Sequence, residues 1–158
     1  MKRIYQNLLD EHLRLHNQMI FLAGPRQVGK TTISLSAAER SNNFYYFNWD
    51  TQEHRELILK GPVTLASKLN LQKIYEKPTV VVFDEIHKYS KWKSFLKGFY
   101  DNYKDKLQII VTGSAKLNVY RSGGDSLMGR YFPYRIHPLS VAECLRTNLS
   151  ENEIQLPQ

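Results

Sequence analysis

Gly24-Pro25-Arg26-Gln27-Val28-Gly29-Lys30-Thr31 matches the pattern G-x-x-x-x-G-K-[ST] at every fixed position. At ordinary residue frequencies, such a match arises by chance in a chain of this length on the order of 1% of the time or less. The apolar run 19–23 before it predicts a buried strand, and residues 30–40 after it predict a helix. Because a strand and a helix flank the pattern in the required order, we expect an α/β domain.

The residue types of this segment suit the binding of phosphate groups. Backbone N–H groups of the loop and the positive N-terminus of the helix donate hydrogen bonds to phosphate oxygens. Gly24 and Gly29 permit a close approach that a side chain would obstruct. Lys30 places a positive charge at the outer phosphates, and Thr31 offers its hydroxyl to Mg²⁺. The alternative is a glycine-rich turn with an unrelated lysine. The residues expected to contact a nucleoside triphosphate are Gly24, Pro25, Arg26, Gln27, Val28, Gly29, Lys30, Thr31 and Thr32.

Two carboxylates follow the second clear apolar run, residues 79–83. Asp84 comes first after this predicted strand, where it is placed to hold the Mg²⁺ shell, and Glu85 is placed to polarise an attacking water. The alternative is an acidic start to a helix, with Asp84 as its cap and Glu85 favoured by its dipole. Because a complete phosphate-binding pattern lies upstream, we favour the catalytic interpretation.

Ser114 is a weaker candidate, since it follows another predicted strand, residues 107–111. A hydroxyl at this place senses the γ-phosphate or orients the water, and Thr112 is the second choice for this role. The alternative is a helix cap after a glycine turn.

Arg130 is a candidate for stabilising transition-state charge, either within its own chain or in a neighbouring subunit. The alternative is a surface arginine, or one that is paired with Asp125.

Three further features receive a structural interpretation. Asp50 follows a predicted strand, and capping of the next helix is favoured over a role at the nucleotide. His87 lies beside the acidic pair but lacks the companions of a metal site. Lysines alternate with aromatic residues in a pattern that nucleic-acid-binding proteins also show. Since the aromatic residues fall on one helical stripe, we expect them in the core and the lysines in solvent; these lysines are Lys88, Lys91, Lys93, Lys97, Lys104 and Lys106.

Strands and helices alternate along the chain. Strands are predicted at 19–23, 44–47, 79–83, 107–111 and 131–137, and helices near 1–16, 30–40, 52–60, 63–69, 91–103 and from Ser140. Ser140 and Glu143 have the spacing of a capping box. This order predicts a three-layer P-loop NTPase fold with a central, mostly parallel sheet of about five strands. The phosphate-binding segment, the acidic pair and Ser114 all follow strands, where ligands bind in such sheets.

Composition sets the class of protein. The 158 residues fit one domain, which we place at 1–150 with a tail at 151–158. No apolar run approaches the ~18–20 residues of a membrane span, and a single cysteine excludes an intramolecular disulfide, so we expect a cytoplasmic protein without a membrane partner. The net charge of +7 suits polyanions without choosing among nucleotides, nucleic acid and acidic proteins.

The motifs together resemble a known family. With the residues above, Trp92, His137-Pro138-Leu139-Ser140 and Leu127-Met128-Gly129-Arg130, the chain is similar to prokaryotic AAA-type ATPases of the AAA+ superfamily from about Leu8 to Leu145. The resemblance implies ATP as the nucleotide and a five-stranded core with an extra strand between the two motif-bearing strands. In this family the ATPase domain usually precedes a C-terminal domain of unknown function, whereas this sequence ends at Gln158. Neighbouring subunits and a lid commonly complete such sites, so we expect weak turnover here.

The leading hypothesis is therefore a Mg²⁺-dependent ATPase that forms ADP and phosphate. The alternatives are a nucleotide-dependent switch that binds a partner protein with little hydrolysis, and a nucleic-acid-associated ATPase. A small-molecule phosphotransferase ranks last, since no arginine-rich lid segment is evident. A homo-oligomer is an open expectation. No guanine-reading N-K-x-D segment occurs, which favours ATP over GTP.

Overall fold

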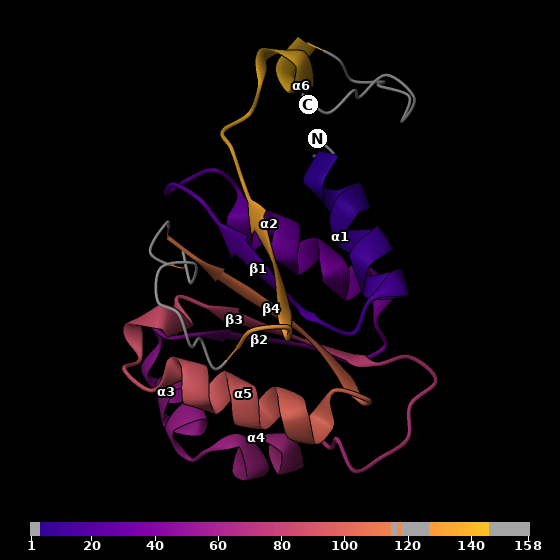
Figure 1. Cartoon of the computed structure of the whole chain (residues 1–158), viewed down its shortest axis with the longest axis vertical. Helices are drawn as coiled ribbons and strands as arrows, with labels where there is room; N and C mark the ends of the chain where they lie inside the picture. The colour runs from indigo at the N-terminus through magenta and orange to yellow at the C-terminus, as the bar shows by residue number, and fades with distance from the viewer. Residues whose placement is uncertain (1–3, 115–116, 118–126, 146–158) are drawn as a thin grey trace.

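The computed structural model describes residues 4–114, 117 and 127–145. The predicted tail 151–158 and Asp125 lie outside these residues. A five-stranded sheet forms the centre, in the order β2-β3-β4-β1-β5, and all neighbouring strands pair in parallel (Figure 1). The strands are β1 (Met19–Ala23), β2 (Phe44–Asn48), β3 (Thr79–Asp84), β4 (Leu107–Gly113) and β5 (Tyr131–Arg135). The predicted fold class is thereby confirmed.

Helices cover both faces of the sheet (Figure 1). They are α1 (Ile4–Leu15), α2 (Lys30–Leu35), η1 (Ser36–Arg40), α3 (Gln52–Leu59), α4 (Pro62–Lys68), η2 (Ile86–Lys88), α5 (Trp92–Tyr103) and α6 (Val141–Leu145). Alternate strand residues feed two separate cores, as the pleat requires. Val80 and Val82 pack with α1, α2 and η1, whereas Val81 and Phe83 pack with α3, α4 and α5. The three central strands, β1, β3 and β4, are consequently buried almost entirely, which explains why they are mainly apolar instead of alternating.

The strand order brings the candidate groups together. β4 lies between β1 and β3, with Ile110 opposite both Ile20 and Val82. The segments after these three strands therefore meet at one edge of the sheet, because all three strands are parallel. This arrangement confirms the expected extra strand between the two motif-bearing strands.

Two strands are longer than their predicted bounds. β3 includes Asp84 and β4 extends to Gly113, with Asp84 paired to Thr112. The ladder continues beyond this pair, since the Glu85 N–H donates to the Thr112 carbonyl. Asp84 is therefore the last residue of its strand and not the first after it, and its side chain is buried.

The predicted helix 30–40 is divided in two. α2 ends at Leu35 and a 3-10 helix, η1, completes the segment. The hydroxyls of Ser34 and Ser36 donate to the carbonyls of Thr31 and Ile33, at 2.8 and 2.6 Å. Such hydroxyls compete with backbone donors inside a helix, which accounts for the tighter second half.

Other predicted features agree with the structure. The Glu143 N–H donates to the Ser140 hydroxyl at 3.1 Å and the Ser140 N–H donates to the Glu143 carboxylate at 3.0 Å, which is the predicted capping box. On α5 the apolar stripe is buried or half-buried, while Lys97 and Lys104 are exposed. None of the helices in the described ranges combines the length and apolar character that crossing a membrane requires.

Candidate active site

The loop between β1 and α2 has the backbone that its glycines predict. Gly29 has φ 87°, a left-handed conformation that glycine adopts readily. Gly24 is required for a different reason, since a Cβ there would lie 2.4 Å from the Ile136 carbonyl oxygen. The Ile136 N–H donates to the Ala23 carbonyl, so the chain leaving β5 passes directly over Gly24. Val28 is buried and anchors the loop to the core, whereas its other middle residues are exposed: Pro25, Arg26 and Gln27.

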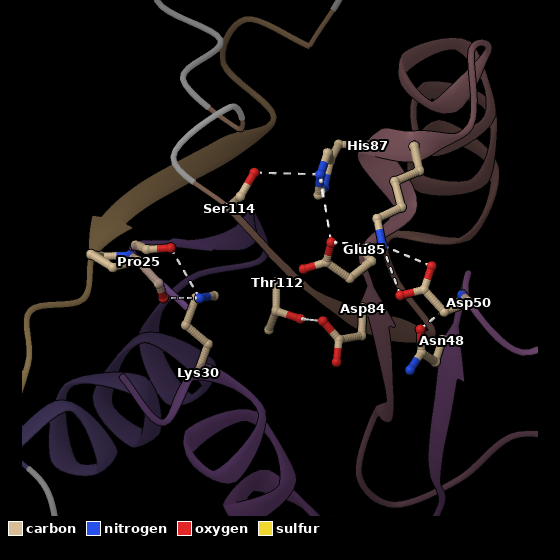
Figure 2. A network of polar contacts seen from close by, with 11 residues as sticks. Pro25, Lys30, Asn48, Asp50, Asp84, Glu85, His87, Thr112 and Ser114 are labelled. Atoms are coloured by element: carbon tan, nitrogen blue, oxygen red, sulfur yellow. Dashed lines mark hydrogen bonds and ion pairs between the residues drawn. The ribbon is translucent and has the colours of Figure 1, made fainter. Parts of the chain in front are cut away.

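Lys30 opens α2 and folds back over this loop. Its Nζ donates to the carbonyl oxygens of Gly24 at 3.0 Å and Pro25 at 2.5 Å (Figure 2). Burial lowers the pKa of Lys30, and the charges of Glu85 and Asp84 counteract this effect. The ammonium is thus held on the loop near two carboxylates. Its N–H groups can donate to phosphate oxygens in place of the two carbonyls.

Asp84 receives hydrogen bonds from three hydroxyls on three elements. Thr31 of α2 donates to Oδ2 at 3.1 Å, Tyr46 of β2 donates to Oδ2 at 2.5 Å, and Thr112 of β4 donates to Oδ1 at 2.5 Å. Burial, and then the bond to Asp84, raises the pKa of Tyr46. The phenol therefore stays protonated and remains a donor to the carboxylate.

Glu85 adopts a left-handed backbone with φ 58°, which is uncommon for a residue with a side chain. This turn directs the chain from β3 into η2, and Glu85 precedes that short helix directly. Its Oε2 lies 3.3 Å from Nζ of Lys88 and 3.7 Å from Nε2 of His87. Lys88 also contacts both carboxylate oxygens of Asp50, at 2.8 and 2.7 Å, and this bond raises the pKa of Lys88.

His87 connects the acidic pair to Ser114. The Ser114 hydroxyl lies 3.5 Å from Nε2 of His87, so Ser114 and Glu85 face the same ring atom (Figure 2). Gly113 leaves room for this ring, because a Cβ there would lie 2.7 Å from Nδ1 of His87. The predicted candidate Ser114 thus lies near the acidic pair, while Thr112, the second choice, bonds to Asp84 instead.

Several of these groups line a pocket of about 660 Å³. Its lining residues are Arg26, Gln27, Gly29, Lys30, Thr31, Thr32, Asn48, Asp50, Asp84, Glu85 and Lys88. The volume is in the usual range for a small-molecule site. Hard oxygen donors from Thr31 and Asp84 suit Mg²⁺, which is commonly bound by one or two protein groups together with substrate phosphates. No cluster of three or more His, Cys, Asp or Glu side chains able to hold a metal occurs among the described residues.

Arg130 lies at the other end of the sheet. Its carbonyl accepts the N–H of Met19, the first residue of β1, and its guanidinium pairs with Asp101 of α5 at 2.7 Å. The loop begins after Ala23, five residues further along β1, which at ~3.3 Å per residue is on the order of 15 Å away. Arg130 therefore does not join the pocket of its own chain.

Sequence reasoning missed three residues of the site or gave them other roles. The sequence pattern does not mark Tyr46, places Lys88 in solvent, and favours Asp50 as the cap of α3. The structure instead places Thr51 at the start of α3, and the Asp50 carboxylate pairs with Lys88. The available signal is the position of Tyr46 two residues before the end of its strand. The sequence does not reveal that β3, which carries Asp84, lies beside that strand.

Known proteins share this sequence pattern and fold. A family profile described as an AAA domain matches residues 16–145. An uncharacterized protein of Methanocaldococcus jannaschii, MJ1637, is 28% identical over 134 residues, which cover 81% of this chain and 28% of that protein. The solved structure of C. elegans PCH-2 superposes with a TM-score of 0.59 at 16% identity, covering 86% of this chain and 42% of the other. This chain thus spans less than half the length of either protein. The family match, over most of the sequence and over every motif described above, places the chain in the AAA domain family of P-loop ATPases.

Proposed function

We propose that this chain binds Mg·ATP in the pocket and hydrolyses it to ADP and phosphate. The observation that carries the proposal is the hydrogen bond from Thr31 to Asp84, 3.1 Å long. It joins the two groups that P-loop ATPases use around the metal ion, and it does so at the wall of the pocket. A structural capping role for Asp84 would not require this contact.

Each residue then has a defined task. Lys30 exchanges its carbonyl partners for oxygens of the outer phosphates. Thr31 and Asp84 hold Mg²⁺, which supplies charge neutralisation when bound. Glu85 accepts a proton from the attacking water as the water oxygen bonds to the γ-phosphorus and the bond to the ADP oxygen breaks. Ser114 orients the water or contacts the γ-phosphate.

The surroundings of Glu85 support its role as a base. The ion pairs with His87 and Lys88 both use Oε2, which leaves Oε1 as the oxygen to accept the proton of the attacking water. Lys88 and His87 hold the side chain from one side, and Asp50 in turn holds Lys88. An oriented carboxylate at the edge of a nucleotide pocket is the arrangement that water activation requires.

The same contacts favour a second candidate, a nucleotide-dependent switch with little hydrolysis. Here Lys88 restrains Glu85 until a partner protein or another copy of the chain displaces it. The ATPase domain proposed for residues 1–150 would then act on the remainder of a longer protein, since the relative MJ1637 has most of its length outside the matched region.

Calorimetric titration with ATP and Mg²⁺ tests the site. We expect binding by the wild type, a loss of roughly a hundredfold in Lys30→Ala because a charged donor is removed, and no change in Lys60→Ala, an exposed lysine outside the pocket. A folded wild type that binds no ATP would overturn the proposal.

Turnover separates the two candidates. Glu85→Gln should keep ATP binding and lower hydrolysis by about 10²–10⁴-fold if Glu85 is the base. If wild type and Glu85→Gln bind ATP equally and both hydrolyse it negligibly, the switch is the better description.

A further inference from the structure

We propose that Tyr46 is a positioning residue for the metal ion, acting through the carboxylate of Asp84. The inference rests on the proposed Mg·ATP site and adds a residue from β2 to it. No motif of the sequence marks Tyr46, and its role follows from the hydrogen bond of its hydroxyl to Oδ2 of Asp84, 2.5 Å long.

The register of the sheet explains how Tyr46 reaches Asp84. Tyr46 is opposite Val82, and Asn48 is opposite Asp84, so Tyr46 is the diagonal neighbour of the carboxylate. Aromatic side chains span such diagonals on one face of a sheet. The ring packs with the core cluster on the α2 side, where Val80 and Val82 also point, and this is the side from which Thr31 approaches.

The three hydroxyls together fix the carboxylate. Thr31 of α2 and Tyr46 of β2 donate to Oδ2, and the fully buried Thr112 of β4 donates to Oδ1. In the proposed site Thr31 also offers its oxygen to Mg²⁺, so Tyr46 is the donor to Oδ2 that has no second task there. Tyr46 contributes the donor from β2, the strand next to β3 at the sheet edge.

Removal of the Tyr46 hydroxyl therefore affects the metal more than the nucleotide. Tyr46→Phe keeps the ring and its packing but leaves Oδ2 with Thr31 as its donor. Partners that orient metal ligands from the outer shell typically account for about 10–100-fold in metal affinity. The phosphate contacts of the loop and Lys30 do not involve Tyr46, so binding of ATP without metal should be retained.

The neighbouring residue offers a matched control. Tyr45 precedes Tyr46 on β2, is half-buried as Tyr46 is, and packs on the opposite face of the sheet against the other core. Tyr45→Phe removes the same hydroxyl from the same strand without touching Asp84.

The experiment is a calorimetric titration of Mg²⁺ into the ATP-loaded protein. A parallel calorimetric titration measures the binding of ATP in EDTA. We expect Mg²⁺ affinity to fall about tenfold in Tyr46→Phe and to stay within twofold of wild type in Tyr45→Phe. ATP affinity in EDTA should stay within twofold in both variants. Melting temperatures of both variants establish that each is folded.

Two results would overturn the role of Tyr46. One is an unchanged or higher Mg²⁺ affinity in Tyr46→Phe, and the other is an equal loss of ATP affinity with and without Mg²⁺, which indicates general damage to the pocket. In either case the wild type still binds Mg·ATP. A wild type without Mg²⁺-dependent ATP binding refutes the proposed function itself, so the two failures are distinguishable.

Discussion

The hydroxyl of Thr31 donates to Oδ2 of Asp84 although 53 positions separate the two residues in the sequence. This bond crosses from the first turn of α2 to the end of β3, over the gap that β4 creates between β1 and β3. Neither segment alone specifies a metal site. Their meeting at one pocket makes a hydroxyl and a carboxylate available together, which is why the pair has testable consequences for metal binding.

Thr31→Val should abolish most of the Mg²⁺ dependence of ATP binding. Valine has nearly the shape of threonine but lacks the hydroxyl that the metal and Asp84 use. We expect the affinity for Mg²⁺ in the ATP complex to fall by roughly 10–100-fold in calorimetry. Thr32→Val is the matched control, since Thr32 also lines the pocket and is exposed but has no contact with Asp84. Equal losses in the two variants would contradict the assignment.

Gly24→Ala should destabilise the fold by about 1–3 kcal/mol, the usual cost of an overpacked site. The new Cβ would lie 2.4 Å from the Ile136 carbonyl oxygen, which is backbone and cannot move without disturbing the β1–β5 pairing. Denaturant unfolding measures the loss, and it should be accompanied by weaker ATP binding.

Gly98→Ala provides the control with the opposite sign. Gly98 lies inside α5, and a Cβ there would have its nearest contact at 3.7 Å, with Pro62. Alanine should raise the unfolding free energy by about 0.5–1 kcal/mol, since glycine is the poorer helix former. Equal effects of the two substitutions would show that the Ile136 contact is not what constrains Gly24.

Arg130→Ala should leave ATP binding by a single chain within about twofold of wild type, because Arg130 lies at the opposite end of the sheet from the pocket. Loss of the partly exposed ion pair between Arg130 and Asp101 should lower the unfolding free energy by less than about 1 kcal/mol. If Arg130 serves a neighbouring subunit, wild-type turnover per chain rises with protein concentration and that of Arg130→Ala does not. A tenfold loss of ATP affinity in Arg130→Ala would contradict its placement.

The fold was predictable from the sequence because its signals are local. The apolar runs mark the three central strands, which are buried on both faces, the pattern 24–31 identifies the loop, and the Ser140–Glu143 spacing identifies a cap. The bounds were wrong where polar residues continue a strand. Asp84 and Thr112 are polar, which is typical of residues that follow a strand. They nevertheless pair across β3 and β4, because the Thr112 hydroxyl donates to the Asp84 carboxylate.

Contacts between distant segments were predictable only where a sequence motif identifies the residues involved. Asp84 and Lys30 belong to motifs, whereas Tyr46 and the Asp50–Lys88 pair depend on which strands are neighbours. Strand periodicity gives the face on which Tyr46 points but not the strand beside it. The position of Arg130 is limited in the same way. Arg130 precedes a strand, which places it at the amino end of the sheet only if all strands are parallel, and the sequence does not show that they are.

The buried His12 should make stability depend on pH. Its Nε2 donates to the Gln18 carbonyl and its Nδ1 accepts the hydroxyl of Tyr134, both at 2.8 Å, so the neutral ring satisfies both partners. Burial is the largest cause that lowers the pKa of His12 below its ordinary 6.5; the charge of His16 acts in the same direction, and the Gln18 bond opposes it. In the unfolded chain His12 binds a proton near pH 6.5, whereas in the folded chain it binds that proton only at lower pH. The unfolding free energy therefore has its full value above about pH 6.5 and falls as the pH drops below it.

Thermal denaturation between pH 5 and 8 measures this dependence, with the pH range chosen around the ordinary pKa of histidine. His12→Gln should be less stable at pH 8, because the Tyr134 bond is lost, yet its melting temperature should fall less between pH 7 and 5.5 than that of wild type. His16→Gln is the control, since His16 is exposed and its removal should keep most of the wild-type slope. Acidic groups common to all three proteins cancel in the comparison. Parallel curves for wild type and His12→Gln would mean that His12 is protonated without cost in the folded state, and that the Tyr134 hydroxyl accepts from it instead of donating.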